Sequence, residues 1–133
     1  GYDYIESLSA FREGYIQVQD ISSMLVGKIA DPAQDNYVID VCAAPGGKST
    51  QIAGKMMGEG LLVSNEYYSQ RAKILSQNIE RMGVRNAVVV NESTEHMAEL
   101  FLEFFLQTEL FQSSLMVFLL CSVFQNVNMI FMS

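Results

Sequence analysis

The chain has 133 residues, a formal net charge of −7 and a pI near 4.5. That length suits about one domain and is short for an α/β enzyme that carries both cofactor and substrate machinery, so we expect a fragment. The acidic charge argues against a protein that grips nucleic-acid phosphates by itself, because such affinity rests largely on Lys and Arg.

The two cysteines, Cys42 and Cys121, show no Cys-x-x-Cys spacing, and no signal segment leads the chain. This usage argues against a disulfide framework or a zinc site, so we expect no bound metal and a reduced, cytoplasmic compartment. The apolar run 115–124 is too short to cross a bilayer of roughly 30 Å, and polar residues follow it. We therefore interpret it as a buried strand and expect no membrane partner.

Residues 1–35 form a lead-in segment in which we predict one helix, over about residues 21–30. Asp20 is placed as its N-cap, and Pro32 marks its end. Four apolar residues recur there at helical spacing: Ile21, Met24, Leu25 and Ile29.

Residues 36–105 alternate between strand and helix patterns. Short apolar runs rich in β-branched residues predict strands at 37–42, 61–65 and 87–91. Helical spacing between them predicts one helix that opens at Gly46 and Gly47 and another that closes at Gly83. An amphipathic helix is then predicted from Met97, Leu100, Phe101, Phe104 and Phe105. Such alternation predicts an α/β fold with a parallel sheet and a ligand site at the carboxyl ends of its strands.

A glycine turn directly after the first predicted strand is typical of a ligand-binding loop. Gly46 and Gly47 let backbone N–H groups approach a ligand beside the positive end of a helix dipole. Glu66 follows the second strand, 19 residues after Gly47, where an acidic side chain in Rossmann-type sites accepts hydrogen bonds from ribose hydroxyls.

An alternative is a phosphate loop, since residues 46–49 read Gly-Gly-Lys-Ser. That motif requires a glycine where Cys42 stands, Pro45 stiffens the loop, and no second acidic strand for Mg²⁺ is visible. A nucleotide triphosphatase is therefore the weaker interpretation.

Residues 40–50, Asp-Val-Cys-Ala-Ala-Pro-Gly-Gly-Lys-Ser-Thr, resemble the cofactor motif of the Nop2/Sun RNA cytosine-C5 methyltransferases, a family that includes bacterial ribosomal-RNA members. The preceding segment 14–24 and the following one to about Phe105 are similar to that family too. The resemblance implies an incomplete Rossmann-like methyltransferase fold, with the first three to four parallel strands, and S-adenosyl-L-methionine as cofactor. It also implies ribosomal RNA as substrate of the whole enzyme. The implied cofactor-binding residues are Cys42, Ala43, Ala44, Pro45, Gly46, Gly47, Lys48 and Glu66.

The family's catalytic cysteines lie in Asp-x-Pro-Cys-Ser and Thr-Cys-Ser motifs, and neither is present here. Enzymes of this kind attack cytosine C6 with a thiolate, so we expect no catalytic residue in this chain. We interpret Cys42 and Cys121 as packing residues. His96, the single histidine, lacks ligand partners at suitable spacing and is expected to be a solvated helix residue.

Residues 106–133 form a divergent apolar tail without glycine, proline, Lys or Arg. We interpret it as the product of a disrupted reading frame, with a native but divergent tail as the alternative. An exposed sheet edge and tail would promote self-association. The alternative function is a noncatalytic cofactor-binding or interaction module whose tail docks on a partner.

Overall fold

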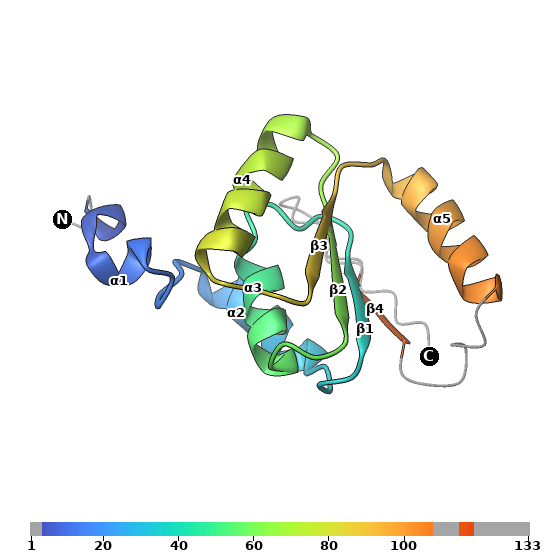
Figure 1. The fold of residues 1–133 in the computed structure, drawn as a ribbon, viewed down its shortest axis with the longest axis horizontal. Helices are drawn as coiled ribbons and strands as arrows, with labels where there is room; N and C mark the ends of the chain where they lie inside the picture. The colour runs from blue at the N-terminus through green and yellow to red at the C-terminus, as the bar shows by residue number, and fades with distance from the viewer. Residues whose placement is uncertain (1–3, 108–114, 119–133) are drawn as a thin grey trace.

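A computed structural model describes residues 4–107 and 115–118 of the chain. Its helices and strands alternate from residue 21 onward, as Figure 1 shows. In chain order the elements are η1 (Ile5–Ser7), α1 (Ser9–Arg12), α2 (Ile21–Ala30), β1 (Tyr37–Asp40), α3 (Gly47–Met56), β2 (Leu61–Asn65), α4 (Ser69–Arg81), β3 (Ala87–Val90), α5 (Thr94–Gln107) and β4 (Leu115–Phe118).

The four strands form one parallel sheet in the order β3-β2-β1-β4. In the central pairs, Tyr37 is level with Leu61 on one side and with Leu115 on the other. The three strands and the parallel sheet predicted from the sequence are thus confirmed. The fourth predicted strand, 115–124, is confirmed over Leu115–Phe118, and its remainder lies outside the described residues.

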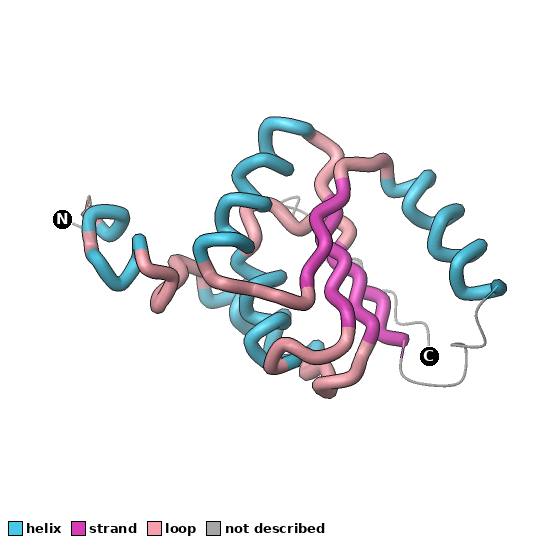
Figure 2. The backbone as a smooth tube through the Cα atoms, viewed as in Figure 1, coloured by secondary structure: helices cyan, strands magenta, loops and turns pink. Residues whose placement is uncertain are grey.

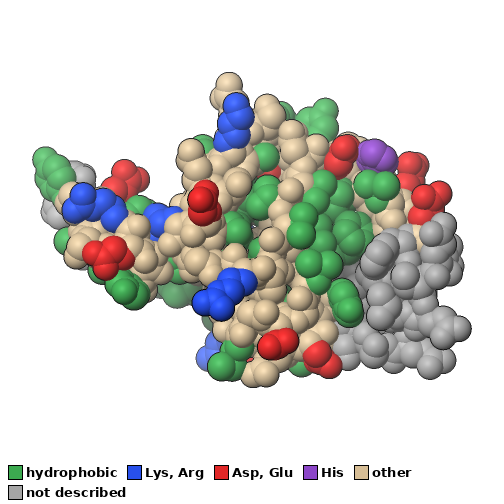
Figure 3. All heavy atoms as spheres, viewed as in Figure 1, with side chains coloured by type: hydrophobic (Ala, Val, Ile, Leu, Met, Phe, Trp, Pro, Cys, Tyr) green, Lys and Arg blue, Asp and Glu red, His purple; other side chains and the backbone are tan. Residues whose placement is uncertain are grey.

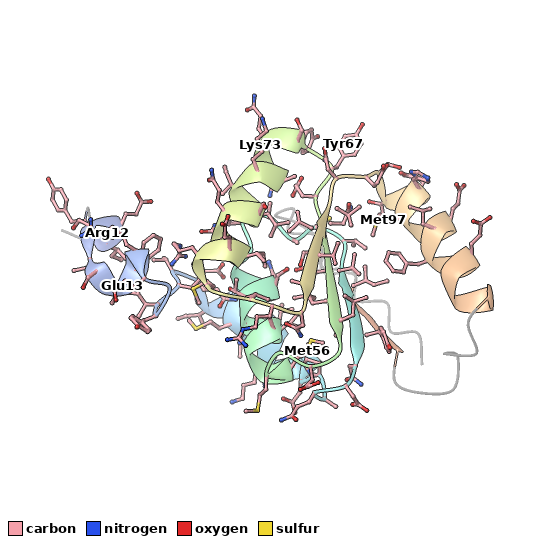
Figure 4. The ribbon with its side chains drawn as sticks, viewed as in Figure 1. Arg12, Glu13, Met56, Tyr67, Lys73 and Met97 are labelled. Carbon is pink, nitrogen blue, oxygen red and sulfur yellow. The ribbon has the colours of Figure 1, made fainter. Side chains whose placement is uncertain are left out.

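Helices cover both faces of the sheet, with α2, α3 and α4 on one side and α5 on the other (Figures 1 and 2). Alternate strand residues supply the two cores. Val38 and Leu62 pack against Met56 of α3, whereas Ile39 and Val63 pack against Met97 of α5. Figure 4 shows Met56 between α3 and the strands and Met97 pointing from α5 toward the sheet.

Helix α2 begins and ends where the sequence predicts, but it packs with a different face. The Asp20 carboxylate accepts a hydrogen bond from the Ser23 amide at 2.9 Å, which confirms the N-cap. The apolar residues whose spacing predicted the helix, Ile21, Met24, Leu25 and Ile29, are exposed. Gly27 and Ala30 are buried instead. These small residues let α2 approach α3 closely, and a Cβ at Gly27 would lie 2.4 Å from the Gln51 side chain.

Two of the predicted strands end earlier than expected. β1 ends at Asp40 rather than at residue 42, and β3 ends at Val90 rather than at residue 91. Just beyond both strand ends the Asn65 side chain replaces strand pairing, because it donates to the Val41 carbonyl and accepts from the Glu92 amide. The lead-in also contains two short helical turns, η1 and α1, that the sequence pattern did not predict.

Two polar side chains of the domain hold the part of the lead-in between Phe11 and Met24. Arg81 of α4 donates hydrogen bonds to the carbonyl oxygens of Phe11, at 2.6 Å, and Ile16, at 3.2 Å, and its guanidinium lies over the Phe11 ring. Gln51 of α3 accepts from the Gln19 amide at 3.0 Å and donates to the Met24 carbonyl at 3.0 Å. The segment before the sheet is therefore fixed relative to the loop that follows β1.

Across the described ranges 4–107 and 115–118, the helices all fall short of the length and apolar character needed to cross a membrane.

Candidate cofactor site

The loop after β1 turns sharply into α3 through Gly46. Its φ of 110° lies in the region that favours glycine, and an added Cβ would sit 3.1 Å from Leu75 Cδ1. At Gly47 an added Cβ would sit 3.3 Å from the Gln19 side chain. Gly46 is thus required by its φ and by the close approach of α4, whereas at Gly47 the Gln19 side chain would have to shift slightly to admit a Cβ. No side chain caps the first turn of α3 at Gly46, so its amides retain their capacity to bind an anion.

One face of α4 holds this loop in place. Arg71 donates to the Ala44 carbonyl at 3.0 Å, and Asn78, two turns later, donates to the Pro45 carbonyl at 2.8 Å. Leu75 lies between them on the same face and packs against Ala43 and Ala44. Two carbonyl groups of the loop, those of Ala44 and Pro45, are therefore satisfied by side chains of α4.

Glu66 lies directly after β2 and is only 3% exposed. One carboxylate oxygen accepts a hydrogen bond from the Tyr68 amide at 3.1 Å, and the other lies 3.6 Å from the Arg71 guanidinium. Arg71 therefore contacts both Glu66 and the glycine loop, and it joins an acidic group to the start of α3. An open hollow of about 440 Å³ lies at the start of α4 and is lined by Tyr68, Ser69, Gln70 and Arg71.

Two asparagines tie the carboxyl ends of the strands together. Asn65, which is fully buried, donates to the carbonyls of Val41 at 3.2 Å and Glu92 at 3.0 Å, and accepts from the Glu92 amide at 3.0 Å. Asn91 donates to the carbonyls of Glu66, at 2.6 Å, and Tyr67, at 2.8 Å. The segments that follow β1, β2 and β3 are thus connected side by side at one edge of the sheet. Tyr67 marks this edge in Figure 4.

Beneath the loop lies a buried polar chain. Ser49 of α3 donates to Asp40 Oδ2 at 2.8 Å, and Ser64 of β2 donates to Ser49 Oγ at 3.0 Å. All three side chains are fully buried, and among the described residues no donor lies within hydrogen-bond distance of Asp40 Oδ1. Burial raises the pKa of Asp40 from 3.8 to about 6, against the Ser49 hydrogen bond and the Lys48 charge, which favour the ionised form.

The structure brings the sequence-predicted site residues to one edge. Residues 42–48 form the loop and the first turn of α3, and Glu66 is joined to that loop through Arg71. Cys42 packs against the α5-side core, in agreement with its interpretation as a packing residue. Cys121 lies outside the described residues.

His96 lies half-exposed on α5, as predicted, but it has a partner that the sequence pattern did not indicate. Its Nδ1 lies 2.9 Å from Glu92 Oε2, and this contact raises the pKa of His96. Figure 3 shows the histidine in purple among acidic side chains of α5. Within ranges 4–107 and 115–118, no three His, Cys, Asp or Glu residues are grouped so that they could hold a metal ion.

The phosphate-loop alternative conflicts with the position of Ser49. In that motif the hydroxyl must reach a bound Mg²⁺. Here Ser49 is fully buried and its hydroxyl is directed to Asp40. The geometry therefore favours the Rossmann-type interpretation of the loop.

Sequence reasoning missed the residues that hold the site together: Asp40 as a buried acid, Asn65, Arg71, Asn78 and Asn91. Ser64 and Asn65 were available signals, because polar residues inside an otherwise apolar strand call for buried partners. The sequence held a weaker signal for the contacts that α4 makes with the loop. Arg71 and Asn78 are seven residues apart and share a helix face, but their targets lie 27 and 33 residues earlier in the chain.

The fold and sequence match known methyltransferases. Residues 28–118, more than half of the chain, match the family described as 16S rRNA methyltransferase RsmB/F. The chain is 48% identical over 80 residues to ribosomal RNA small subunit methyltransferase F of Vibrio parahaemolyticus, covering 59% of this chain and 17% of that protein. It is 32% identical over 96 residues to the tRNA (cytosine(72)-C(5))-methyltransferase of Pyrococcus horikoshii, covering 72% of this chain and 25% of that protein.

Solved structures agree with these matches. NSun6 from Pyrococcus horikoshii, solved with SFG, superposes with a TM-score of 0.69 at 32% identity, covering 73% of this chain and 25% of that one. A Thermotoga maritima S-adenosylmethionine-dependent O-methyltransferase shares the fold alone, with a TM-score of 0.54 at 15% identity over 71% of this chain and 34% of that one. The chain spans a quarter or less of the length of the curated relatives named here. On the match over residues 28–118, the chain belongs to the RsmB/F family of 16S rRNA methyltransferases.

Proposed function

We propose that this chain binds S-adenosyl-L-methionine at the edge formed by residues 42–48 and Glu66, as the cofactor-binding part of an RNA cytosine-C5 methyltransferase acting on ribosomal RNA. The observation that carries the proposal is the joining of Glu66 to the glycine loop by Arg71. An acidic group and an uncapped helix start are thereby held at one edge of a Rossmann-like sheet.

The residues present fit this cofactor. The amides at the start of α3 suit its carboxylate. Within the part of the chain that the structure describes, the Glu66 carboxylate accepts one hydrogen bond, from the Tyr68 amide, and its remaining lone pairs suit two ribose hydroxyls. The unpaired Oδ1 of buried Asp40 supplies negative charge beneath a ligand whose sulfonium and ammonium groups are positive. Lys48 lies in the first turn of α3, where its positive charge offsets that of Asp40 and suits the carboxylate of the cofactor.

Each group of this chain has a separate task. S-adenosyl-L-methionine supplies an electrophilic methyl group. Glu66 holds the ribose, and Arg71 keeps the Glu66 carboxylate at its place beside Ala44. Asn65 and Asn91 keep the ends of the three strands in register, so that loop and carboxylate act on one ligand.

Methyl transfer itself requires residues that this sequence does not contain. The sequence has no Asp-x-Pro-Cys-Ser or Thr-Cys-Ser segment, and Cys42 packs into the core. We infer that the chain alone binds the cofactor, does not methylate cytosine, and holds RNA weakly because of its net charge of −7. A cytoplasmic location and self-association through the tail are part of the same proposal.

Calorimetric titration with S-adenosyl-L-methionine tests the proposal. Saturable binding is expected, and Glu66→Ala should weaken it about tenfold or more through loss of charge-assisted hydrogen bonds. Glu59→Ala is the matched control, because Glu59 is an exposed acid just before the opposite end of the same strand. Absence of binding by a folded chain, or equal weakening by both variants, would contradict the proposal.

The alternative is an interaction module whose apolar tail docks on a partner or on itself. Sedimentation velocity distinguishes this alternative from the proposed cofactor-binding function. Concentration-dependent association without cofactor binding would favour the alternative, and a monomer that binds cofactor would favour our proposal.

A further inference from the structure

Asp40 lies at the carboxyl end of β1, beneath the loop proposed to bind the cofactor. Its carboxyl group is fully buried, and Oδ2 accepts a hydrogen bond from Ser49, whereas no donor of residues 4–107 and 115–118 is within hydrogen-bond distance of Oδ1. The backbone N–H of Cys42 also favours the ionised form. Burial of an ionised carboxylate with a single side-chain donor is costly. An apolar or amide side chain would fill this buried position without the cost of burying a charge. The presence of an acid here therefore calls for an explanation.

The hydroxyl chain below Asp40 accommodates both of its protonation states. With Asp40 ionised, the O–H of Ser64 is directed to Ser49 and the O–H of Ser49 to Asp40 Oδ2, at 3.0 and 2.8 Å. With Asp40 protonated on Oδ2, the same contacts run in reverse, because a hydroxyl both donates and accepts. Neither state requires a side chain to move.

Few charges act on this group. Among the described residues these are Lys48, in the first turn of α3, which favours the ionised form, and Glu66, after β2, which disfavours it. Burial has the largest effect and raises the pKa of Asp40 to about 6. The unliganded protein therefore holds a proton at Asp40 in mildly acidic solution.

A ligand with positive charge changes this balance. S-adenosyl-L-methionine carries a sulfonium, an ammonium and a carboxylate, with a net charge of +1. An added positive charge near a buried carboxyl favours the ionised form. We propose that binding of S-adenosyl-L-methionine is coupled to release of the Asp40 proton to solvent, so that Asp40 is a counterion formed only when the cofactor is present. This inference rests on the proposed function.

The experiment is calorimetry of S-adenosyl-L-methionine binding between pH 5 and 7, in buffers with different ionisation enthalpies. Below pH 6 the apparent enthalpy should depend on the buffer, showing proton release, and affinity should rise up to about tenfold per pH unit toward neutrality. The window stays below the titration of the cofactor's own amino group.

Three variants test whether the released proton comes from Asp40. Asp40→Asn should bind the cofactor without proton release or pH dependence. Ser49→Ala should move proton release to higher pH, because it removes the hydrogen bond that favours the ionised form. His96→Asn is the control, since His96 is an exposed titratable group on α5 outside the proposed site, and its replacement should leave the linkage intact.

The outcomes separate the two proposals. Binding that is independent of pH and buffer in the native chain, or linkage that persists in Asp40→Asn, overturns the role of Asp40 and leaves cofactor binding standing. No binding at any pH by a chain with a folded circular dichroism spectrum overturns the proposed function itself.

Discussion

Asp40 shows how one buried acid links the stability of the fold to pH. In the folded chain its pKa is about 6, above the value of 3.8 expected when unfolded. Between these values the folded state binds more protons, so the contribution of Asp40 to stability is complete below pH 4 and is lost as the pH rises through about 6. The loss amounts to about 3 kcal/mol.

Urea denaturation at several pH values checks this account. Asp40→Asn cannot ionise, so at pH 7 we expect it to be more stable than the native chain by about 2 kcal/mol. At pH 4 the two chains should be nearly equal. A variant that is less stable at pH 7 would show that the ionised carboxylate stabilises the fold.

Gly46 is required by its backbone and by its neighbour. We expect Gly46→Ala to lower the free energy of unfolding by about 1 to 3 kcal/mol, because its φ is 110° and the new Cβ would press on Leu75. Gly54 of α3 is the matched control, since an added Cβ there meets nothing within 4 Å. Gly54→Ala should stabilise by about 0.5 to 1 kcal/mol. Equal effects of the two substitutions on a chemical denaturation curve would refute the argument.

At the scale of the element, α4 is the part that shapes the site. Its face with Arg71, Leu75 and Asn78 holds the loop from Ala43 to Gly46. The sequence predicted α4 from its apolar spacing, and the buried residues Ala72, Leu75 and Ile79 confirm it. Its polar contacts could not be predicted, because spacing within a helix does not say which distant carbonyl a side chain will reach.

Asn78→Ala tests this holding role. It frees the Pro45 carbonyl, so amide hydrogen exchange in the loop 43–47 should quicken by about tenfold, which corresponds to the loss of one hydrogen bond. Gln77→Ala, an exposed neighbour on the same helix, should leave exchange unchanged. Unchanged exchange in both variants would mean that the loop is held by packing alone.

Arg81 attaches the lead-in segment, and its removal should free that segment without unfolding the sheet. In Arg81→Ala, trypsin is expected to cleave after Arg12 faster than in the native chain, because the Phe11 and Ile16 contacts are lost. Arg85→Ala removes an exposed arginine and is the control. The idea fails if cleavage after Arg12 is no faster than in that control.

At the scale of the whole molecule, sequence pattern predicted the order of elements better than it predicted the packing. β2 has the predicted bounds, and α2 begins and ends as expected. Yet α2 packs through Gly27 and Ala30 while Ile21, Leu25 and Ile29 remain exposed. Hydrophobic spacing indicates a helix, but close contact between two helices depends on small residues whose partner the pattern cannot reveal.

The acidic charge of the surface is also a property of the whole molecule. Figure 3 shows acidic side chains over α5 and scattered basic ones elsewhere on this face. The family match concerns enzymes of ribosomal RNA, whereas this chain carries 15 acidic and 8 basic residues. This excess of acidic residues agrees with the proposal that the chain by itself holds RNA weakly.

The most direct test of cofactor binding at this edge is the change in backbone amide NMR signals of the folded chain on adding S-adenosyl-L-methionine. We predict shifts at Ala43, Ala44, residues 46–48 and residues 66–68, with α1 (Ser9–Arg12) unchanged. A folded spectrum that does not change, or changes confined to residues away from the loop and Glu66, would contradict the account.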